Sequence, residues 1–239
     1  MIQLNDVRAG YVPGVNILHG LSLKADLGEI VTVIGPNGSG KSTSLRAVSG
    51  QILPRHGQVI VNGADVSRLP IDRRVREHKV ALVPQSENVF GALTVRENLD
   101  LGGAFMTVQS RKRRIEALLE TYPVLRRKFN NKAYSMSGGE RQILALARAL
   151  MPDPYYLLLD EPSAGLSPMM LEEVFEAIVG IVRKTGISVL LVEQNAAEAL
   201  AISDRAYVLV MGKAVIEGRA GAILNDEKMR ALYLGGEEV

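Results

Sequence analysis

The sequence predicts an α/β fold: a mostly parallel sheet with helices on its faces, an antiparallel β region at the N-terminus, and a helical insertion at about residues 86–150. Two nearly all-apolar segments, 30–34 and 187–192, have the composition of strands that are buried on both faces, as strands in parallel sheets are. Residues 155–192 alternate strand, helix and strand, which is typical of a parallel sheet. No long linker interrupts the chain, so we expect a single domain over residues 1–239.

The N-terminal third of the chain is predicted to consist mainly of strands. Residues 20–26 alternate apolar and polar side chains, which is the pattern of a half-buried strand. A turn at Gly28 precedes the buried strand 30–34. Short apolar segments at 58–61 and 79–83 predict two more strands.

The predicted insertion contains signals for helices. Thr94 and Glu97 have the spacing of a capping box, in which two side chains satisfy backbone N–H groups at a helix start. Residues 110–121 carry apolar side chains on one face, and a second helix is expected over 140–150. Beyond the insertion, apolar residues at helical spacing predict a helix over 168–184.

Composition excludes several classes of protein. Among 239 residues, 28 Lys and Arg nearly balance 26 Asp and Glu, which argues against a dedicated nucleic-acid-binding protein. The absence of cysteine excludes disulfides, thiolate metal sites, iron–sulfur ligation and cysteine nucleophiles. No apolar run approaches the ~20 residues of a membrane span, and the N-terminal segment lacks the features of a secretory signal. We therefore expect a soluble, cytoplasmic, globular protein.

The strongest motif is a glycine-rich loop between the buried strand 30–34 and a following helix. It fits the phosphate-loop pattern Gly-x-x-x-x-Gly-Lys-Ser/Thr and reads Gly35-Pro36-Asn37-Gly38-Ser39-Gly40-Lys41-Ser42-Thr43. The glycines let backbone N–H groups point at phosphate oxygens, and the helix start adds the positive end of its dipole. We expect Lys41 to reach the β- and γ-phosphates of a nucleotide and the Ser42 hydroxyl to bind Mg²⁺. The alternative is a glycine-rich turn without a ligand.

Two carboxylates follow the apolar run 155–159. Asp160 stands at the C-terminal end of a predicted parallel strand, the edge at which such sheets bind ligands, and we expect it to hold Mg²⁺ through water. Glu161 follows it and is the candidate to polarise the attacking water. The alternative is a polar strand end that leads into a turn at Pro162.

A third motif stands at the start of the predicted helix 140–150 and reads Ser137-Gly138-Gly139-Glu140. Its structural interpretation is a capping box, with Ser137 as the cap and Glu140 three residues later. A capped helix start with two glycines also presents free N–H groups to an anion. The two interpretations are compatible.

Along the chain come the phosphate loop, Gln85 after a strand, the Met-Ser-Gly-Gly-Glu segment 136–140 and the Leu-Leu-Leu-Asp-Glu-Pro run that contains Asp160. This ordered set resembles the motifs of the ATP-binding cassette (ABC) ATPases over essentially the whole chain. The resemblance implies a phosphate-loop core into which a helical subdomain is inserted. It also implies that two cassettes pair head to tail, so that the signature segment 136–140 of each completes the ATP site of the other. Gln85 resembles a glutamine that contacts Mg²⁺ and lies beside the surface that touches the membrane partner. Tyr11 resembles the aromatic residue that stacks on adenine; the alternative is an ordinary loop tyrosine.

The chain departs from the general ABC pattern at three positions. Glu140 stands where the signature usually ends in Gln, and Ser167 stands where many members have Asp. Gln194 replaces a usual His that contacts the γ-phosphate, so we expect it to position that phosphate without titrating. With the ending 233–236 (Tyr-Leu-Gly-Gly), these features resemble the shorter of the two ATPases of branched-chain amino-acid importers and of their amide and urea relatives.

The resemblance therefore implies the ATP-hydrolysing subunit of an importer, peripheral to the cytoplasmic face of the inner membrane. Its implied cofactors are ATP and Mg²⁺. Its implied partners are a second cassette, identical or different, two membrane permeases and, indirectly, a periplasmic or surface solute-binding protein, but no nucleic acid. The alternatives are a urea or short-chain amide importer and a soluble ABC ATPase of the iron–sulfur assembly type; the Gln194 motif favours an importer. The segment between the phosphate loop and residues 136–140 is too short to contain the long coiled coil that splits the cassette in DNA-maintenance ABC proteins.

Two basic runs, 111–114 and 126–128, have two possible interpretations. They fit attraction to an anionic membrane surface or a membrane partner, or they form a solvated helix face. The net charge of +2 favours the solvated face. The histidines His19, His56 and His78 have no metal-ligand spacing, and we expect them to be structural.

Overall fold

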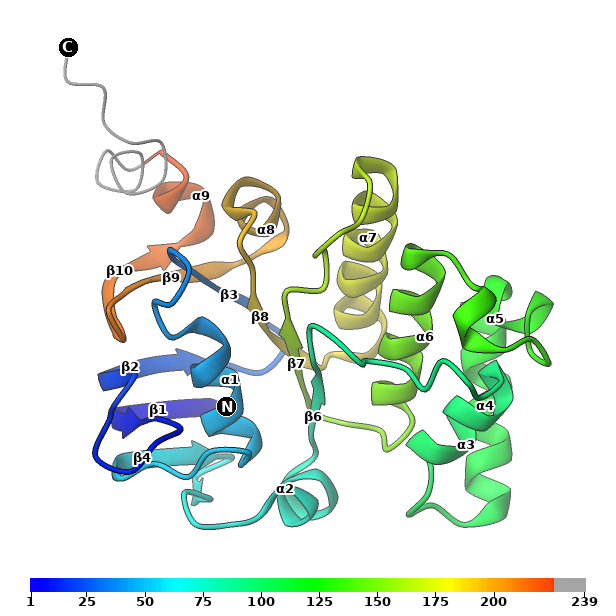
Figure 1. Ribbon diagram of the computed structural model, residues 1–239, viewed down its shortest axis with the longest axis horizontal. Coiled ribbons are helices and arrows are strands. Elements are labelled where there is room, and N and C mark those ends of the chain that lie inside the picture. Colours follow the sequence, from blue (N-terminus) through cyan, green and yellow to red (C-terminus); the bar gives the residue numbers. More distant parts are fainter. Residues whose placement is uncertain (226–239) are drawn as a thin grey trace.

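The computed structural model describes residues 1–225, so the expected Tyr-Leu-Gly-Gly ending at 233–236 lies outside the described residues. The strands, drawn in Figure 1, are β1 (Ile2–Ala9), β2 (Leu18–Ala25), β3 (Ile30–Ile34), β4 (His56–Val61), β5 (Ala64–Asp65), β6 (Val80–Val83), β7 (Tyr156–Asp160), β8 (Ser188–Val192), β9 (Arg205–Val210) and β10 (Lys213–Arg219). The helices are α1 (Lys41–Ser49), α2 (Ile71–His78), α3 (Val95–Gly102), α4 (Val108–Thr121), α5 (Pro123–Arg127), α6 (Gly138–Leu150), α7 (Pro168–Thr185), α8 (Ala196–Ile202) and α9 (Ala220–Ile223), with a 3₁₀ turn at Ala133–Ser135.

The strands form two sheets. The first is antiparallel with the order β2-β1-β4-β5, and the second has the order β10-β9-β3-β8-β7-β6. All neighbours in the second sheet are parallel except β10, which pairs antiparallel with β9 at the edge. In Figure 1 the antiparallel sheet lies on the left and helices α3 to α7 lie on the right. The predicted α/β architecture is therefore confirmed.

The larger sheet is covered on both faces, as its composition predicts. Every residue of β3, β7 and β8 is buried. On one face, the apolar core joins the sheet to the antiparallel strands and α1. On the other face, one continuous core joins it to α3, α4, α6 and α7. Because β3, β8 and β7 pair in parallel, their carboxyl ends lie at one edge of the sheet, where the sequence places its candidate site.

Helix α7 illustrates how the apolar pattern sets the packing. It buries Val174, Phe175, Ile178 and Ile181 along one stripe, which is the spacing of a helix that packs on a sheet. It ends at Gly186, whose φ of 70° provides the left-handed C-cap. The expected helix over 168–184 is thus confirmed to within one residue.

Helix α2 is anchored by a charge. Arg74 is fully buried, and its guanidinium donates to the carbonyls of Leu69, Ala47, Val48 and Ser67 at 2.7–3.2 Å. Ala47 and Val48 belong to the last turn of α1, where carbonyls lack partners within the helix. Arg74 therefore fastens α2 to the C-terminal end of α1. Burial lowers the pKa of Arg74 to about 10.

Within residues 1–225, none of the helices combines the length and the apolar character that crossing a membrane requires.

Candidate functional site

The glycine-rich loop connects the end of β3 to the start of α1. Gly40 is the N-cap of α1 with φ 101°, a conformation that favours glycine, and it offers no side chain to the first-turn N–H groups. A Cβ at Gly35 would collide with the carbonyl oxygen of Leu209 and lie 2.7 Å from Ser39 Oγ. The loop thus forms a tight cradle at a helix start whose N–H groups remain available to an anion.

Ser39 supports the assignment of an anion site. Its Oγ atom is buried and has no hydrogen-bond partner among residues 1–225. Buried hydroxyls are nearly always partnered in folded proteins. A phosphate oxygen held in the loop would provide the missing partner.

Lys41 is the cation of this loop. It is only 5% exposed, and its Nζ donates to the carbonyls of Gly35 at 2.9 Å and Pro36 at 3.3 Å. Burial lowers the pKa of Lys41, while the nearby carboxylates of Glu161 and Asp160 act in the opposite direction. The ammonium is therefore already withdrawn from bulk water and held by weak acceptors that a phosphate can replace.

Ser42 and Asp160 meet across the site. Ser42 Oγ donates to Asp160 Oδ1 at 2.7 Å, although the two residues are 118 positions apart. Asp160 is the last residue of β7 and is 4% exposed, and burial raises its pKa. A hydroxyl and a carboxylate provide hard oxygen donors, which suit Mg²⁺. The fold thus brings together two of the three residues that are predicted to contact the metal, and Gln85 is the third.

The carboxylate of Glu161 contacts Gln85, which the sequence also predicts as a site residue. Gln85 Nε2 donates to Glu161 Oε2 at 2.5 Å. The backbone of Glu161 has φ 45°, a left-handed conformation that is rare for residues other than glycine, and its N–H donates to Val192 O at 2.9 Å. Gln85 thus contacts the candidate base, and its predicted contact with Mg²⁺ remains a prediction.

Gln194 lies near this group but is exposed, and its side-chain amide makes no hydrogen bond within residues 1–225. Its position is set by Glu193, a residue that the sequence analysis overlooks. Glu193 is 1% exposed, and its carboxylate accepts from Gln194 N at 3.1 Å and from Ser163 N at 3.0 Å. Burial raises the pKa of Glu193. One buried carboxylate therefore joins the segments that follow β7 and β8.

The signature segment forms the helix cap that its sequence predicts. Ser137 Oγ accepts from Glu140 N at 3.2 Å, and Glu140 Oε2 accepts from Ser137 N at 2.8 Å and from Lys128 Nζ at 2.6 Å. Figure 1 places α6 among the helices on the right, with β6 and β7 between it and α1. The fold therefore does not bring this helix start to the phosphate loop of the same chain.

Tyr11 lies in the loop between β1 and β2 and is 51% exposed. Its hydroxyl accepts from Arg46 Nη1 at 2.7 Å and lies 3.4 Å from Thr43 Oγ1. The Arg46 guanidinium carbon is 5.4 Å from the ring centroid. The fold thus places Tyr11 beside α1, and the sequence gives no sign of its partner Arg46.

The basic runs are largely engaged within the chain. Arg111 pairs with Asp100, and Arg126 pairs with Glu116. Arg114 donates to the carbonyl of Leu150 and pairs with an aspartate. These pairs favour the solvated, internally paired interpretation over a free basic surface.

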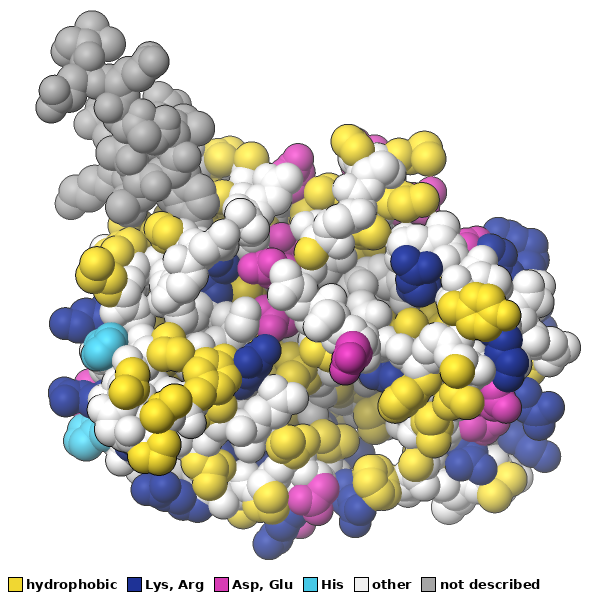
Figure 2. All heavy atoms as spheres, in the orientation of Figure 1, with side chains coloured by type: hydrophobic (Ala, Val, Ile, Leu, Met, Phe, Trp, Pro, Cys, Tyr) yellow, Lys and Arg dark blue, Asp and Glu magenta, His cyan; other side chains and the backbone are white. Residues whose placement is uncertain are grey.

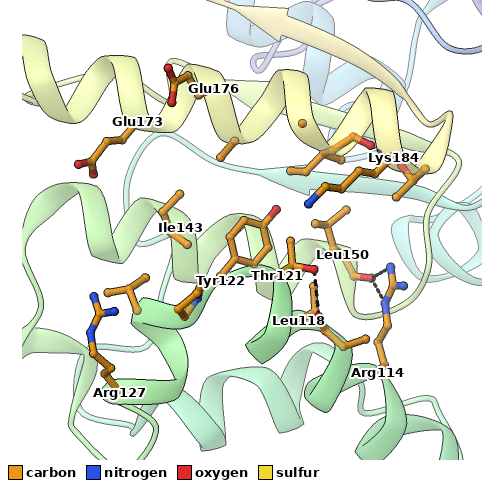
Figure 3. Close-up of a pocket in the computed structure, with 17 residues that line it drawn as sticks. Arg114, Leu118, Thr121, Tyr122, Arg127, Ile143, Leu150, Glu173, Glu176 and Lys184 are labelled. Carbon is orange, nitrogen blue, oxygen red and sulfur yellow. Dashed lines mark hydrogen bonds between the residues drawn. The ribbon is translucent and has the colours of Figure 1, made fainter.

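A group of acidic side chains near the centre of the face in Figure 2 occupies the area where Figure 1 draws the ends of β7 and β8. A separate pocket of about 580 Å³ lies between α4, α5, α6 and α7. Figure 3 shows Tyr122 and Lys184 pointing into it. None of its lining residues belongs to the phosphate loop or to the carboxylate pair, so it is distinct from the candidate site.

Among residues 1–225, His, Asp and Glu side chains do not gather in groups of three or more that could hold a metal ion by themselves. The candidate metal position thus depends on Ser42 and Asp160 together with oxygens from a ligand.

Comparison with known proteins gives consistent matches. The chain matches the ABC transporter family over residues 18–164. It is 42% identical, over 95% of its length, to the high-affinity branched-chain amino acid transport ATP-binding protein BraG of Pseudomonas aeruginosa, of which it covers 96%. It is 40% identical, over 98% of its length, to the probable branched-chain amino acid transport ATP-binding protein LivF of Archaeoglobus fulgidus, of which it covers 99%. It is 33% identical, over 92% of its length, to the lipopolysaccharide export system ATP-binding protein LptB of Haemophilus influenzae, of which it covers 91%.

Solved structures of ATP-binding cassettes also resemble this chain. A nucleotide-free ATP-binding cassette from an ABC transporter superposes with a TM-score of 0.87 at 25% identity, covering 99% of both chains. A cassette solved as a dimer in a post-hydrolysis state with ADP and Pi superposes with a TM-score of 0.80 at 27% identity, covering 92% of this chain and 99% of that one. The motifs, the fold and these matches agree, and the chain belongs to the ABC transporter family as an ATP-hydrolysing ATPase.

Proposed function

We propose that this chain is the ATP-hydrolysing subunit of an importer for branched-chain amino acids. The observation that carries the proposal is the 42% identity with BraG over 95% of the chain, against 33% with the export protein LptB. The Val-Glu-Gln-Asn sequence at 192–195 and the Ser-Gly-Gly-Glu sequence at 137–140 support the same subgroup. Under this proposal the chain acts as one domain over residues 1–239, with residues 86–150 as its helical subdomain, on the cytoplasmic face of the membrane.

The geometry supports a specific division of labour in ATP binding. Residues 35–43 would cradle the phosphates through backbone N–H groups, and Lys41 would exchange its two carbonyl partners for the β- and γ-phosphates. Ser42 and Asp160 would hold Mg²⁺, which neutralises charge on the phosphate oxygens. The exposed ring of Tyr11 would stack on adenine.

For hydrolysis, Glu161 would accept the proton of the attacking water, because its carboxylate follows directly on Asp160 at the same edge of the sheet. In this structure its carboxylate is hydrogen-bonded to Gln85. Gln194 would donate its amide to the γ-phosphate, since its side chain is exposed and makes no hydrogen bond within residues 1–225.

The signature segment, residues 136–140, would act on a second cassette. Its helix start is separated from the phosphate loop of its own chain by β6 and β7, yet Gly138 and Gly139 leave N–H groups for an anion. The site of one cassette would thus be closed by residues 136–140 of another, and two permeases would transmit the closure to the solute pathway.

The test uses Glu161→Gln in the assembled transporter, with Glu172→Gln on the exposed face of α7 as the matched control. Glu161→Gln should bind ATP normally and hydrolyse it about 10²–10⁴-fold more slowly, because general-base assistance is lost. Uptake of labelled leucine by cells should fall with it, whereas urea uptake should not change. Wild-type turnover would remove Glu161 from its role. Loss of urea uptake instead of leucine uptake would replace the proposed solute with urea.

A further inference from the structure

The loop between β1 and β2, residues 10–16, carries Tyr11 but has little packing of its own. Tyr11, Val12 and Val15 are 51%, 60% and 57% exposed. Within the loop, Val15 N donates to Val12 O at 3.0 Å, and at its base Ile17 N donates to the carbonyl of Ala9 at 2.7 Å. Apolar burial thus contributes little to holding the loop in the conformation that the structure shows.

One side chain supplies what packing does not. Arg55 donates from Nη1 to Val15 O at 2.6 Å and to Asn16 Oδ1 at 2.8 Å, and from Nη2 to Gly10 O at 3.2 Å and to Val12 O. Three carbonyls from both arms of the loop therefore converge on one guanidinium. Without it, these carbonyls would face one another with only water between them.

Arg55 is itself attached to a rigid part of the fold. Its backbone N–H donates to Arg8 O at 2.8 Å, and the next residue, His56, pairs with Arg8 in the β1–β4 ladder. Arg55 forms no ion pair within residues 1–225. Among the described residues, its guanidinium therefore bonds only to acceptors in the loop. The planar fork of arginine reaches four acceptors at once, which the single ammonium of lysine does less well.

We propose that Arg55 is a positioning residue that sets affinity for the nucleobase by holding loop 10–16, and with it Tyr11, in place beside α1. The proposal rests on the proposed stacking of Tyr11 on adenine. Arg55 fixes the loop backbone, while Arg46 and Thr43 fix the Tyr11 hydroxyl from the side of α1. The ring is thus oriented before the nucleotide arrives. The conformational entropy lost in ordering the loop is lost during folding, so it does not reduce the affinity for the nucleotide.

The expected effect follows from the fraction of molecules with Tyr11 in place. Loss of Arg55 lets the loop adopt other conformations, and the apparent Kd rises in inverse proportion to the competent fraction. If that fraction falls to about a tenth, the Kd for ATP rises about tenfold. The Arg55 side chain makes no hydrogen bond to the phosphate loop within residues 1–225, so a ligand without a base should bind as before, and kcat at saturating ATP should not change.

The experiment measures Kd for ATP and for inorganic tripolyphosphate with the full chain, and KM and kcat with the assembled transporter. Arg55→Gln should raise Kd and KM for ATP about tenfold, leaving kcat and the tripolyphosphate Kd unchanged. Arg55→Lys should recover part of the loss. Arg8→Gln is the matched control, because it removes an exposed positive charge from the strand that anchors Arg55 and should change neither Kd.

Combination with Tyr11→Ala separates the possible failures. In the Tyr11→Ala background, Arg55→Gln should have no further effect on ATP binding. A persisting effect, or an equal loss of tripolyphosphate binding, would overturn the positioning role while leaving the proposed function intact. If Tyr11→Ala leaves ATP affinity unchanged, the proposed adenine contact is wrong and the inference about Arg55 is wrong with it.

Discussion

Replacing the buried Arg74 should lower the free energy of unfolding, by an amount that follows from its contacts in the structure. In Arg74→Met an unbranched apolar side chain replaces the aliphatic part of the arginine, but the guanidinium is lost and four carbonyl oxygens lose their donor. Each buried carbonyl that is left without a partner costs about 1–3 kcal/mol. Against this, burial lowers the pKa of Arg74 from 12.5 to about 10, so removing the charge relieves about 3 kcal/mol of desolvation. The free energy of unfolding should therefore fall by about 1–9 kcal/mol, against the 5–15 kcal/mol typical of a domain.

The assay is urea and thermal unfolding followed by far-UV circular dichroism. The midpoint temperature should fall by about 2–4 °C for each kcal/mol of stability that is lost, as expected for a chain of this size. Arg73→Met is the matched control, because it makes the same chemical change at the neighbouring position, where the side chain is half-exposed and pairs with Glu77 at 2.7 Å on the surface. It should leave stability nearly unchanged. If the two variants lose the same stability, the four carbonyl contacts of Arg74 do not support the fold as argued.

Two further predictions concern the segment after β8. Gln194→Ala should reduce ATP turnover in the assembled transporter about ten- to a hundredfold, because a donor to a charged phosphate is lost. Gln194→His should retain much of the activity. Unchanged turnover in the alanine variant would show that the Gln194 side chain makes no contact with the phosphate. Burial raises the pKa of Glu193 above its ordinary value of 4.5, so the native state binds more protons than the unfolded state in the window above pH 4.5. The contribution of Glu193 to stability is therefore lost as the pH rises through the raised pKa. The difference in unfolding free energy between wild type and Glu193→Gln should shift in favour of the wild type as the pH is lowered from neutrality toward 4.5, and a difference that does not depend on pH would contradict this.

Local patterns predicted the buried core of this fold well. The strands around 30–34, 155–159 and 187–192 are continuous apolar runs, and the structure has them within one residue at each end. The capping boxes at Thr94 and Ser137 could also be predicted from the sequence, because the two partner residues of each box stand three positions apart.

Elements whose stability comes from distant partners were missed. Helix α2 is almost entirely polar, and the residue that it buries is Arg74, whose acceptors come partly from α1. Strand β10 alternates exposed and half-buried residues at the edge of its sheet and has little apolar signal. In the candidate site, Glu193 and Arg46 were missed for the same reason, since a buried carboxylate and a surface arginine acquire meaning only from the residues that the fold places beside them.

The contact between Gln85 and Glu161 has a consequence for energy transfer between distant parts of the chain. The two residues are 76 positions apart, one after β6 on the path to the helices and the other after β7 at the centre of the sheet. Linkage between two events on one molecule is reciprocal. A ligand that binds the Glu161 carboxylate and breaks this bond would make the segment after β6 easier to displace. Conversely, displacement of that segment would free the carboxylate for a ligand, and the two effects are equal in free energy. A single hydrogen bond to a charged group can carry about 1.5–3 kcal/mol of such coupling in either direction.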